Sequence, residues 1–228
     1  LAQLTNSLLL LGSATPSIES FSRAESGEYR KFCLTKRAVL GSCLPNVQVV
    51  DMRKELASGN RSVFSRELRE KMEECLAKKQ QMMLFINRRG FSRVVSCRSC
   101  GKPIECPHCD VALTEHLGDK LVCHYCGYTK AMPRSCPLCG SPYLAGFGLG
   151  TQKAVMMIKA QFPSARVLRM DMDTTSKKDG HEQILDSFRR READILVGTQ
   201  MIVKGHDFPG VTLVGILVAD MSLYNCDF

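Results

Sequence analysis

The sequence lacks the features of a membrane or secreted protein. None of its apolar runs approaches the roughly 20 residues that a membrane-spanning helix requires. The N-terminus has no basic segment followed by an apolar stretch and a cleavage site, which is the pattern of a secretory signal. The sequence begins at Leu1 rather than at methionine, as if it were part of a longer protein.

A Walker A motif, the GxxxxGK[ST] loop that binds nucleotide phosphates, is also absent from the sequence. Residues 146–153 (GFGLGTQK) come nearest, but no glycine directly precedes Lys153, and Ala154 stands where serine or threonine is required. No other stretch fits the pattern. We therefore expect these 228 residues to have no ATPase activity of their own.

Cysteine is abundant, with 12 residues, and eight of them form four CxxC pairs. This spacing favours metal knuckles, in which two sulfurs of one short turn bind the same ion. A disulfide-bonded secreted domain is disfavoured, because the chain is long enough to bury a sizeable core. A thioredoxin-like redox site is disfavoured because it uses one pair at the start of a helix. Since a structural zinc takes four thiolates, the sequence predicts two Zn²⁺ ions.

The four knuckles can pair in a nested or a sequential order. Residues 111–122 (VALTEHLGDKLV) alternate apolar and polar side chains around Gly118 and Asp119, as a β-hairpin would. Closing this hairpin favours nesting, which we expect. Zinc 1 would then be bound by Cys97, Cys100, Cys136 and Cys139, and zinc 2 by Cys106, Cys109, Cys123 and Cys126. His108 and His124 lie inside the CxxC loops and could each replace a cysteine, but we expect them to face solvent.

Other residues near the pairs carry weaker signals. Each second cysteine followed by a glycine predicts a tight turn, often at positive φ, at Gly101, Gly127 and Gly140. We expect the cysteines without a CxxC partner to be packing residues, namely Cys33, Cys43, Cys75 and Cys226. The formal net charge is +8, and eight thiolates with two Zn²⁺ would reduce it to about +4. That charge is compatible with nucleic-acid binding and does not establish it.

Strands and helices are predicted to alternate outside the cysteine block. The helical spacing of apolar residues, with Ser65 placed as an N-cap, indicates helices over residues 65–79, 151–162 and 181–190. Short apolar runs indicate strands over residues 8–11, 82–86, 166–170, 194–197 and 211–218. The alternation predicts an α/β fold with a parallel sheet, into which the cysteine block is inserted.

Two loops at strand ends carry residues suited to ligand binding. They are residues 12–17 (GSATPS) and residues 198–209 (GTQMIVKGHDFP). In the second loop, backbone N–H groups and the Thr199 hydroxyl can hold a phosphate, and Lys204 adds positive charge. Asp207 could accept a hydrogen bond from a sugar hydroxyl. An ordinary polar loop explains these residues equally well.

These runs resemble motifs of superfamily 2 helicases. Residues 12–17 resemble motif III, residues 83–91 (MLFINRRGF) look like motif IV, and residues 197–214 (VGTQMIVKGHDFPGVTLV) resemble motif V. The order of motif IV, an eight-cysteine insertion, "GTQ…FPSARVLRMDMDTT" and motif V resembles the PriA family, the primosomal N′ proteins of bacterial replication restart. Ordinary helicases of the superfamily carry no such insertion at this place, although the glutamate usual in the family's GTE is Gln152 here.

The resemblance implies an ATP-driven 3′→5′ DNA helicase of the bacterial cytoplasm that recognises stalled or forked DNA and initiates primosome assembly. ATP and Mg²⁺ would be its cofactors in the intact protein. DNA, primosome proteins and single-strand-binding protein would be its partners, with no membrane. Motif matching implies coupling or ATP-cleft roles for Ser13, Ala14, Thr15, Gly205 and Asp207. It implies contacts with DNA or the coupling pathway for Thr199, Gln200, Lys204, Arg88 and Arg89.

The resemblance also implies a division of the chain. Residues 1–18 would end a first RecA-like lobe and residues 19–60 would form a linker. A truncated second RecA-like lobe would comprise residues 61–96 and 145–228, with residues 97–144 inserted as a double zinc ribbon. The alternative is a non-enzymatic zinc-ribbon module that binds nucleic acid or protein, which would leave the loop motifs as coincidence.

Overall fold

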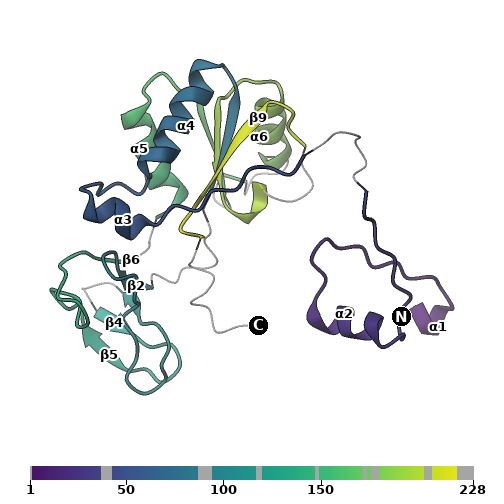
Figure 1. The fold of residues 1–228 in the computed structure, drawn as a ribbon, viewed down its shortest axis with the longest axis horizontal. Helices are drawn as coiled ribbons and strands as arrows, with labels where there is room; N and C mark the ends of the chain where they lie inside the picture. Colours follow the sequence, from purple (N-terminus) through teal and green to yellow (C-terminus); the bar gives the residue numbers. More distant parts are fainter. Residues whose placement is uncertain are drawn as a thin grey trace. The chain divides into compact units, whose positions relative to one another are not determined.

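The computed structural model describes residues 2–36, 43–86, 94–116, 120–146, 149–171, 174–175, 180–202 and 207–219 (Figure 1). The chain divides into two compact units, Leu1–Gln48 and Val49–Phe228. Among the described residues, no helix has both the length and the apolar character that a membrane crossing requires.

The first unit contains two short helices, α1 (Ala2–Thr5) and α2 (Ile18–Glu25). Ser17 caps α2, because its side chain accepts a hydrogen bond from a backbone N–H of the first turn. The strand predicted over residues 8–11 does not form, and these leucines are exposed, Leu8 to 97%. That prediction is wrong because a strand needs a neighbour, and the described part of this unit contains no second strand.

The second unit is built on a four-stranded parallel sheet in the order β7-β8-β1-β9. Its strands are β1 (Gln81–Ile86), β7 (Val167–Met170), β8 (Ile195–Gly198) and β9 (Val211–Leu217). The four strands predicted for this part of the sequence are therefore confirmed, each within a residue or two of its expected ends.

Helices cover both faces of this sheet. In Figure 1, α4 (Arg66–Ala77) and α5 (Thr151–Gln161) lie on one face and α6 (Gly180–Arg189) on the other. Two apolar cores result, and β8 serves both, since Ile195 and Val197 belong to one core and Leu196 to the other. A strand buried on both faces reads as a continuous apolar run, so the α/β parallel-sheet prediction is confirmed.

Two N-caps fix the start of the second unit. Ser65 caps α4 as predicted, accepting a hydrogen bond from the Leu68 N–H at 3.1 Å. A further helix, α3 (Met52–Ala57), begins after Asp51, whose carboxylate accepts from the Arg53 N–H at 2.9 Å. Leu56 of α3 is buried, so this helix packs within the second unit.

The cysteine block forms a separate β-rich module inserted between β1 and α5. In it, β2 (Val95–Cys97) pairs antiparallel with β6 (Leu144–Gly146). A second sheet contains β3 (Thr114–His116), β4 (Lys120–Val122) and β5 (Thr129–Ala131). The antiparallel pairing of β3 with β4 confirms the predicted hairpin. The module has its own small core, which includes Val95, Ile104, Leu113 and Leu121.

The cysteines without a CxxC partner differ in their burial. Cys75 is buried in the main core, as expected of a packing residue. Cys33 and Cys43 are exposed, so the same expectation is wrong for them, because most side chains around them in the first unit are also exposed. Cys226 lies outside the described residues.

Candidate metal centre and motor loops

The eight paired cysteines gather into two groups of four. One group contains Cys97, Cys100, Cys136 and Cys139, and the other Cys106, Cys109, Cys123 and Cys126. Within each group, all four sulfurs lie within 4.8 Å of one another. The sulfurs are therefore brought together in the nested order, with the second group enclosed in sequence by the first.

The sulfur spacing fits a tetrahedral thiolate site. The Cys97 and Cys139 sulfurs are 3.6 Å apart, and those of Cys100 and Cys136 are 3.8 Å apart. Four sulfurs placed about 2.3 Å from one Zn²⁺ in a tetrahedron would be separated by about 3.8 Å. A disulfide would require about 2.05 Å. The two groups therefore suit two zinc ions and are not disulfides.

The backbone of each knuckle turns back on the first cysteine of its pair. The N–H groups of Gly101, Gly127 and Gly140 donate to the carbonyls of Cys97, Cys123 and Cys136 at 2.8, 3.0 and 2.8 Å. All three glycines have positive φ, between 71° and 80°, which confirms the predicted tight turns. In the remaining knuckle Asp110 takes this place at φ 53°, a conformation that aspartate tolerates better than most residues.

The protonation of the thiols is uneven within each group. Burial opposes ionisation of Cys97, but the backbone N–H groups of Cys100 and Ser99 outweigh it and lower the pKa of Cys97 to about 7. The N–H of Cys126 similarly lowers the pKa of Cys123 to about 7.

A different thiol in each group has a raised pKa. The neighbouring Cys126 sulfur raises the pKa of Cys109 to about 12. The Ser141 N–H favours the Cys139 thiolate, but burial and the adjacent sulfurs prevail and raise its pKa to about 12. A second thiolate is unfavourable beside the first, so Zn²⁺ must displace protons when it binds to either group.

The histidines of the module are exposed. His108 packs its ring against Tyr128, with the ring centroids 5.4 Å apart, and His124 faces His116 with 3.2 Å between their Nε2 atoms. Four sulfurs already complete each group, so neither histidine is needed as a ligand. A closed set of four thiolates leaves no position for a reactive water, which makes both sites structural.

Two family profiles match this part of the chain. One, described as the PriA DNA helicase Cys-rich region (CRR) domain, matches residues 106–130. The other, described as the helicase conserved C-terminal domain, matches residues 148–226. The first match falls on the inner cysteine group and the second on the helices and strands that follow the module.

Full-length relatives agree with these profiles. The replication restart protein PriA of Bacillus subtilis (strain 168) is 52% identical over 221 residues, which cover 96% of this chain and 27% of the relative. Its counterpart in Synechocystis is 49% identical over all of this chain, and that of Haemophilus influenzae is 41% identical, also over all of it.

This chain belongs to the PriA family.

The chain spans only 27% to 31% of the length of these three PriA relatives. The predicted order of a RecA-like lobe with a double zinc ribbon inserted after β1 is confirmed by the fold and by the helicase and PriA cysteine-region profiles.

The loop that resembles motif V in this PriA-family chain begins where β8 ends. A Cβ on Gly198 would lie 2.8 Å from the Met170 carbonyl oxygen and 2.5 Å from Ile202 Cγ2, so only glycine fits there. Thr199 follows half-buried, and a short 3₁₀ helix, η1 (Gln200–Ile202), continues the chain. Asp207 is exposed.

The other predicted motor residues are described in part or not at all. In the first unit Ser13, Ala14 and Thr15 are exposed, and the Thr15 N–H donates to Ser13 Oγ at 3.1 Å. The side chain of Gln200 is not among those described. The remaining predicted residues lie outside the described residues: Lys204, Gly205, Arg88 and Arg89.

One polar cluster in the PriA-family lobe had no counterpart in the sequence-based site. Asp171, at the carboxyl end of β7, accepts hydrogen bonds from the Thr151 hydroxyl and from the Thr174 N–H at 3.0 Å. Burial opposes ionisation of Asp171, but these hydrogen bonds and Arg169 prevail and lower its pKa. The Thr175 hydroxyl reaches Met201 Sδ at 3.9 Å, which connects this cluster to η1. The sequence signal that could have indicated this cluster was a threonine, Thr151, at the first position of helix α5.

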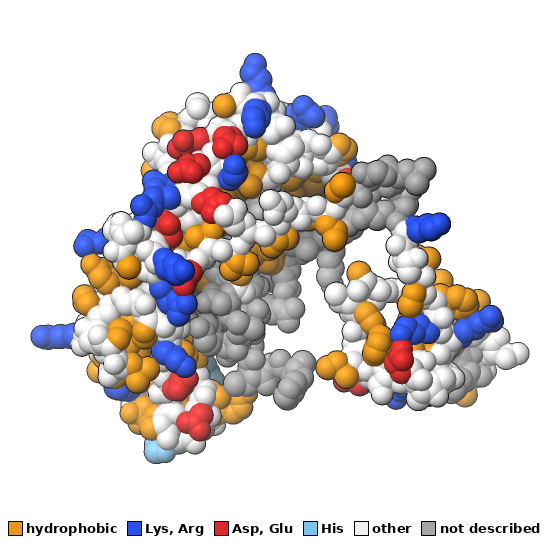
Figure 2. Space-filling model, in the orientation of Figure 1, with side chains coloured by type: hydrophobic (Ala, Val, Ile, Leu, Met, Phe, Trp, Pro, Cys, Tyr) orange, Lys and Arg blue, Asp and Glu red, His pale blue; other side chains and the backbone are white. Residues whose placement is uncertain are grey.

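The surface charge is mixed on the visible face of the molecule. Figure 2 shows basic side chains spread over the helices and the cysteine module, with acidic side chains among them over α3 and α4. The net charge of +8 is therefore not concentrated in a single basic stripe on this face.

Proposed function

We propose that this chain forms the second motor lobe and the zinc module of an ATP-dependent 3′→5′ DNA helicase of the PriA type. The protein that contains it would recognise stalled or forked DNA and initiate replication restart. The observation that carries this proposal is the insertion of two four-thiol groups between β1 and α5 of a parallel sheet. Identity of 52% to a replication restart protein over 96% of the chain supports it.

The two zinc ions are proposed to be structural. Zinc 1 is assigned to Cys97, Cys100, Cys136 and Cys139, and zinc 2 to Cys106, Cys109, Cys123 and Cys126. When bound, each ion supplies four strong bonds that hold knuckles distant in sequence together. A module this small has little apolar core of its own, so metal binding would supply much of its folding free energy.

The loops at the carboxyl ends of the strands are proposed to carry the motor chemistry. Ligands of open α/β sheets gather at this edge, which is where the residues after β8 lie. We assign ATP-cleft or coupling roles to Gly205 and Asp207 in the loop after β8. We assign the same roles to Ser13, Ala14 and Thr15 in the first unit on the motif resemblance alone, because the described residues before them form no strand. We assign DNA contacts or coupling to Thr199, Gln200, Lys204, Arg88 and Arg89. ATP with Mg²⁺ is the proposed nucleotide of the intact protein.

The proposed division of the chain rests on the motif resemblance, with one boundary moved to agree with the compact units. Residues 1–18 are assigned to the end of a first lobe, residues 61–96 and 145–228 to the second lobe, and residues 97–144 to the zinc module. The proposed linker begins at residue 19. Because α3 lies in the same compact unit as the second lobe, we propose that the linker ends before Val49 rather than at residue 60, so that residues 49–60 join the second lobe.

The proposed partners are forked DNA, primosome proteins and single-strand-binding protein, in the bacterial cytoplasm. Support for these partners comes from the replication-restart names of the relatives, whose length greatly exceeds that of this chain.

The deciding experiment measures ATP turnover by the full-length protein that contains this chain, with and without forked DNA. A motor predicts turnover that rises strongly when DNA is added and depends on Mg²⁺. The rival proposal, a non-enzymatic zinc-ribbon module, predicts DNA or protein binding with no DNA-stimulated turnover. The 228-residue chain alone is expected to bind zinc without hydrolysing ATP, because it contains no Walker A lysine.

A further inference from the structure

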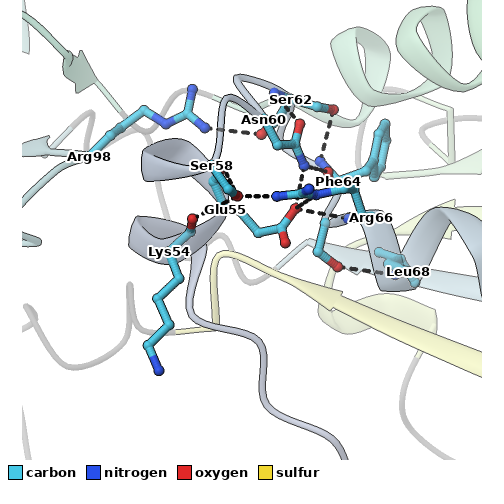
Figure 3. A network of polar contacts seen from close by, with 10 residues as sticks. Lys54, Glu55, Ser58, Asn60, Ser62, Phe64, Arg66, Leu68 and Arg98 are labelled. Atoms are coloured by element: carbon cyan, nitrogen blue, oxygen red, sulfur yellow. Dashed lines mark hydrogen bonds and ion pairs between the residues drawn. The ribbon is translucent and has the colours of Figure 1, made fainter.

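The outer zinc group makes direct contact with the motor lobe through Arg98. This residue lies inside the first knuckle, between Cys97 and Cys100. Its guanidinium donates to the Arg61 carbonyl oxygen at 2.8 Å. It also donates to the Ser62 carbonyl oxygen at 3.0 Å (Figure 3). Charge-assisted hydrogen bonds from the rigid fork of an arginine define an orientation as well as a distance.

Further contacts surround this arginine. A Cβ on Gly101 would lie 3.4 Å from Arg53 Cδ, so the turn of the knuckle rests against α3. The Tyr143 ring lies 5.4 Å from the Arg61 guanidinium carbon, within the range of a cation–π contact. The Tyr143 carbonyl accepts from the Arg98 N–H at 2.8 Å. None of these contacts involves a knuckle of the inner group.

The loop whose carbonyls accept the Arg98 hydrogen bonds is held in place by other contacts within the lobe. The Glu55 carboxylate accepts from Asn60 Nδ2 at 2.6 Å and from the Arg66 N–H at 3.0 Å (Figure 3). The Asn60 side chain also donates to the Phe64 carbonyl at 2.9 Å. The ring of Phe64 is buried in the main core. The carbonyls that Arg98 reaches therefore belong to a loop fixed at both of its ends.

The two sides of the Arg98 contact, the lobe and the cysteine module, are held in place by different interactions. The lobe side is fixed by hydrogen bonds and by Phe64, whereas on the module side Arg98 is flanked by two cysteines of one four-thiol group. If both cysteines ligate the same ion, the backbone of Arg98 is held on either side by a metal bond. Loss of that ion would leave the arginine on a short, unanchored turn.

We propose that zinc site 1, acting through Arg98 as a positioning residue, is the joint that sets the orientation of the cysteine module on the motor lobe, whereas zinc site 2 organises only the distal part of the module. The proposal goes beyond the helicase function and rests on zinc binding at both groups.

The chain offers a matched pair of variants for the test. Cys139 and Cys126 are each the last ligand of their group, and both are exposed. Hydrogen exchange of the zinc-loaded 228-residue chain is measured for Cys139→Ser and Cys126→Ser, with zinc content measured in parallel. We expect Cys139→Ser to speed exchange in residues 58–66 and 95–101 about tenfold, the scale of a lost charge-assisted hydrogen bond. Cys126→Ser should speed exchange in β3 and β4 and leave residues 58–66 unchanged.

A variant that keeps all eight cysteines distinguishes loss of the Arg98 contact from general unfolding of the module. Arg98→Ala should retain two zinc ions per chain and still speed exchange in residues 58–66 and 95–101. Arg134→Ala, an exposed arginine elsewhere in the module, is the control and should change neither segment. Equal effects of Cys139→Ser and Cys126→Ser on residues 58–66 would overturn the proposal. Unchanged exchange in Arg98→Ala would also overturn it.

Discussion

Gly198, where β8 ends and the motif V loop begins, is expected to tolerate no side chain. Alanine at this position would place its Cβ 2.8 Å from the Met170 carbonyl oxygen, which is backbone of the neighbouring strand β7. It would also place it 2.5 Å from Ile202 Cγ2 in η1. Because strand pairing fixes the carbonyl, relief must come from movement of β8 or of η1. Overpacking of this kind costs about 1–3 kcal/mol, and we expect Gly198→Ala at the upper end, about 3 kcal/mol.

Gly215 in β9 supplies the comparison. A Cβ there would lie 2.6 Å from Leu84 Cδ2 and 3.1 Å from Leu68 Cδ1, which are ends of flexible side chains that can rotate away. We therefore expect Gly215→Ala to cost only about 1 kcal/mol, near the lower limit for overpacking. The contrast isolates the contribution of the immovable carbonyl, since both glycines lie in strands of the same sheet.

Urea unfolding of the zinc-loaded chain, followed by far-ultraviolet circular dichroism, measures both variants. Helices and strands of the lobe supply the signal, because the sequence contains no tryptophan for fluorescence. Equal free energies of unfolding for the two variants, or a larger loss for Gly215→Ala, would refute the reasoning from the fixed carbonyl. The DNA-stimulated ATP turnover proposed for the full-length protein is also expected to be lower in Gly198→Ala, because the substitution displaces η1.

Three further predictions concern other parts of the second unit. Gln81 is buried and donates to the carbonyls of Phe188 at 2.7 Å and Ala193 at 2.9 Å, so Gln81→Met should cost about 2–4 kcal/mol in urea unfolding; a loss below that of the exposed change Lys159→Met would contradict this. Hydrogen bonds from Arg166 lower the pKa of Asp194 below 3.8, so its stabilising effect is present above about pH 4 and is lost as the pH falls through the lowered value. Asp194→Asn should thus cost about 1 kcal/mol at pH 7, allowing for solvent screening, and the difference from wild type should shrink in acid; a constant difference would argue against the ion pair. Removal of both zinc ions by a strong chelator should unfold the cysteine module but leave β1 and β8 protected from hydrogen exchange, because the module core is separate from the two cores of the sheet.

Elements with a clear period could be predicted from the sequence. Helix α4 combines an N-cap serine with apolar residues at helical spacing, and its predicted start agrees with the structure. Strands β1 and β8 are buried on both faces, so each reads as an apolar run whatever its surroundings. The grouping of the cysteines followed from spacing and from one hairpin, because zinc geometry leaves few arrangements.

Features that depend on distant partners could not be predicted in this way. Residues 8–11 have the composition of a strand but find no partner among the described residues of their unit. Helix α3 has only six residues, too few for a periodic signal, and it was expected to be linker. The role of Arg98 could not be predicted either, since nothing in the sequence shows that the carbonyls of residues 61 and 62 lie within its reach.

The nesting of the two zinc groups has a consequence for how the chain acquires its metals. Sulfurs of the inner group, such as Cys106 and Cys126, are 20 residues apart, whereas Cys97 and Cys139 are 42 apart. Closing the longer loop from an open chain costs about 0.7 kcal/mol more. During synthesis the ribosome also delivers Cys126 before Cys136. The inner group should therefore bind its ion first. Binding of that ion shortens the free chain between the outer knuckles, which must come together to bind the second ion.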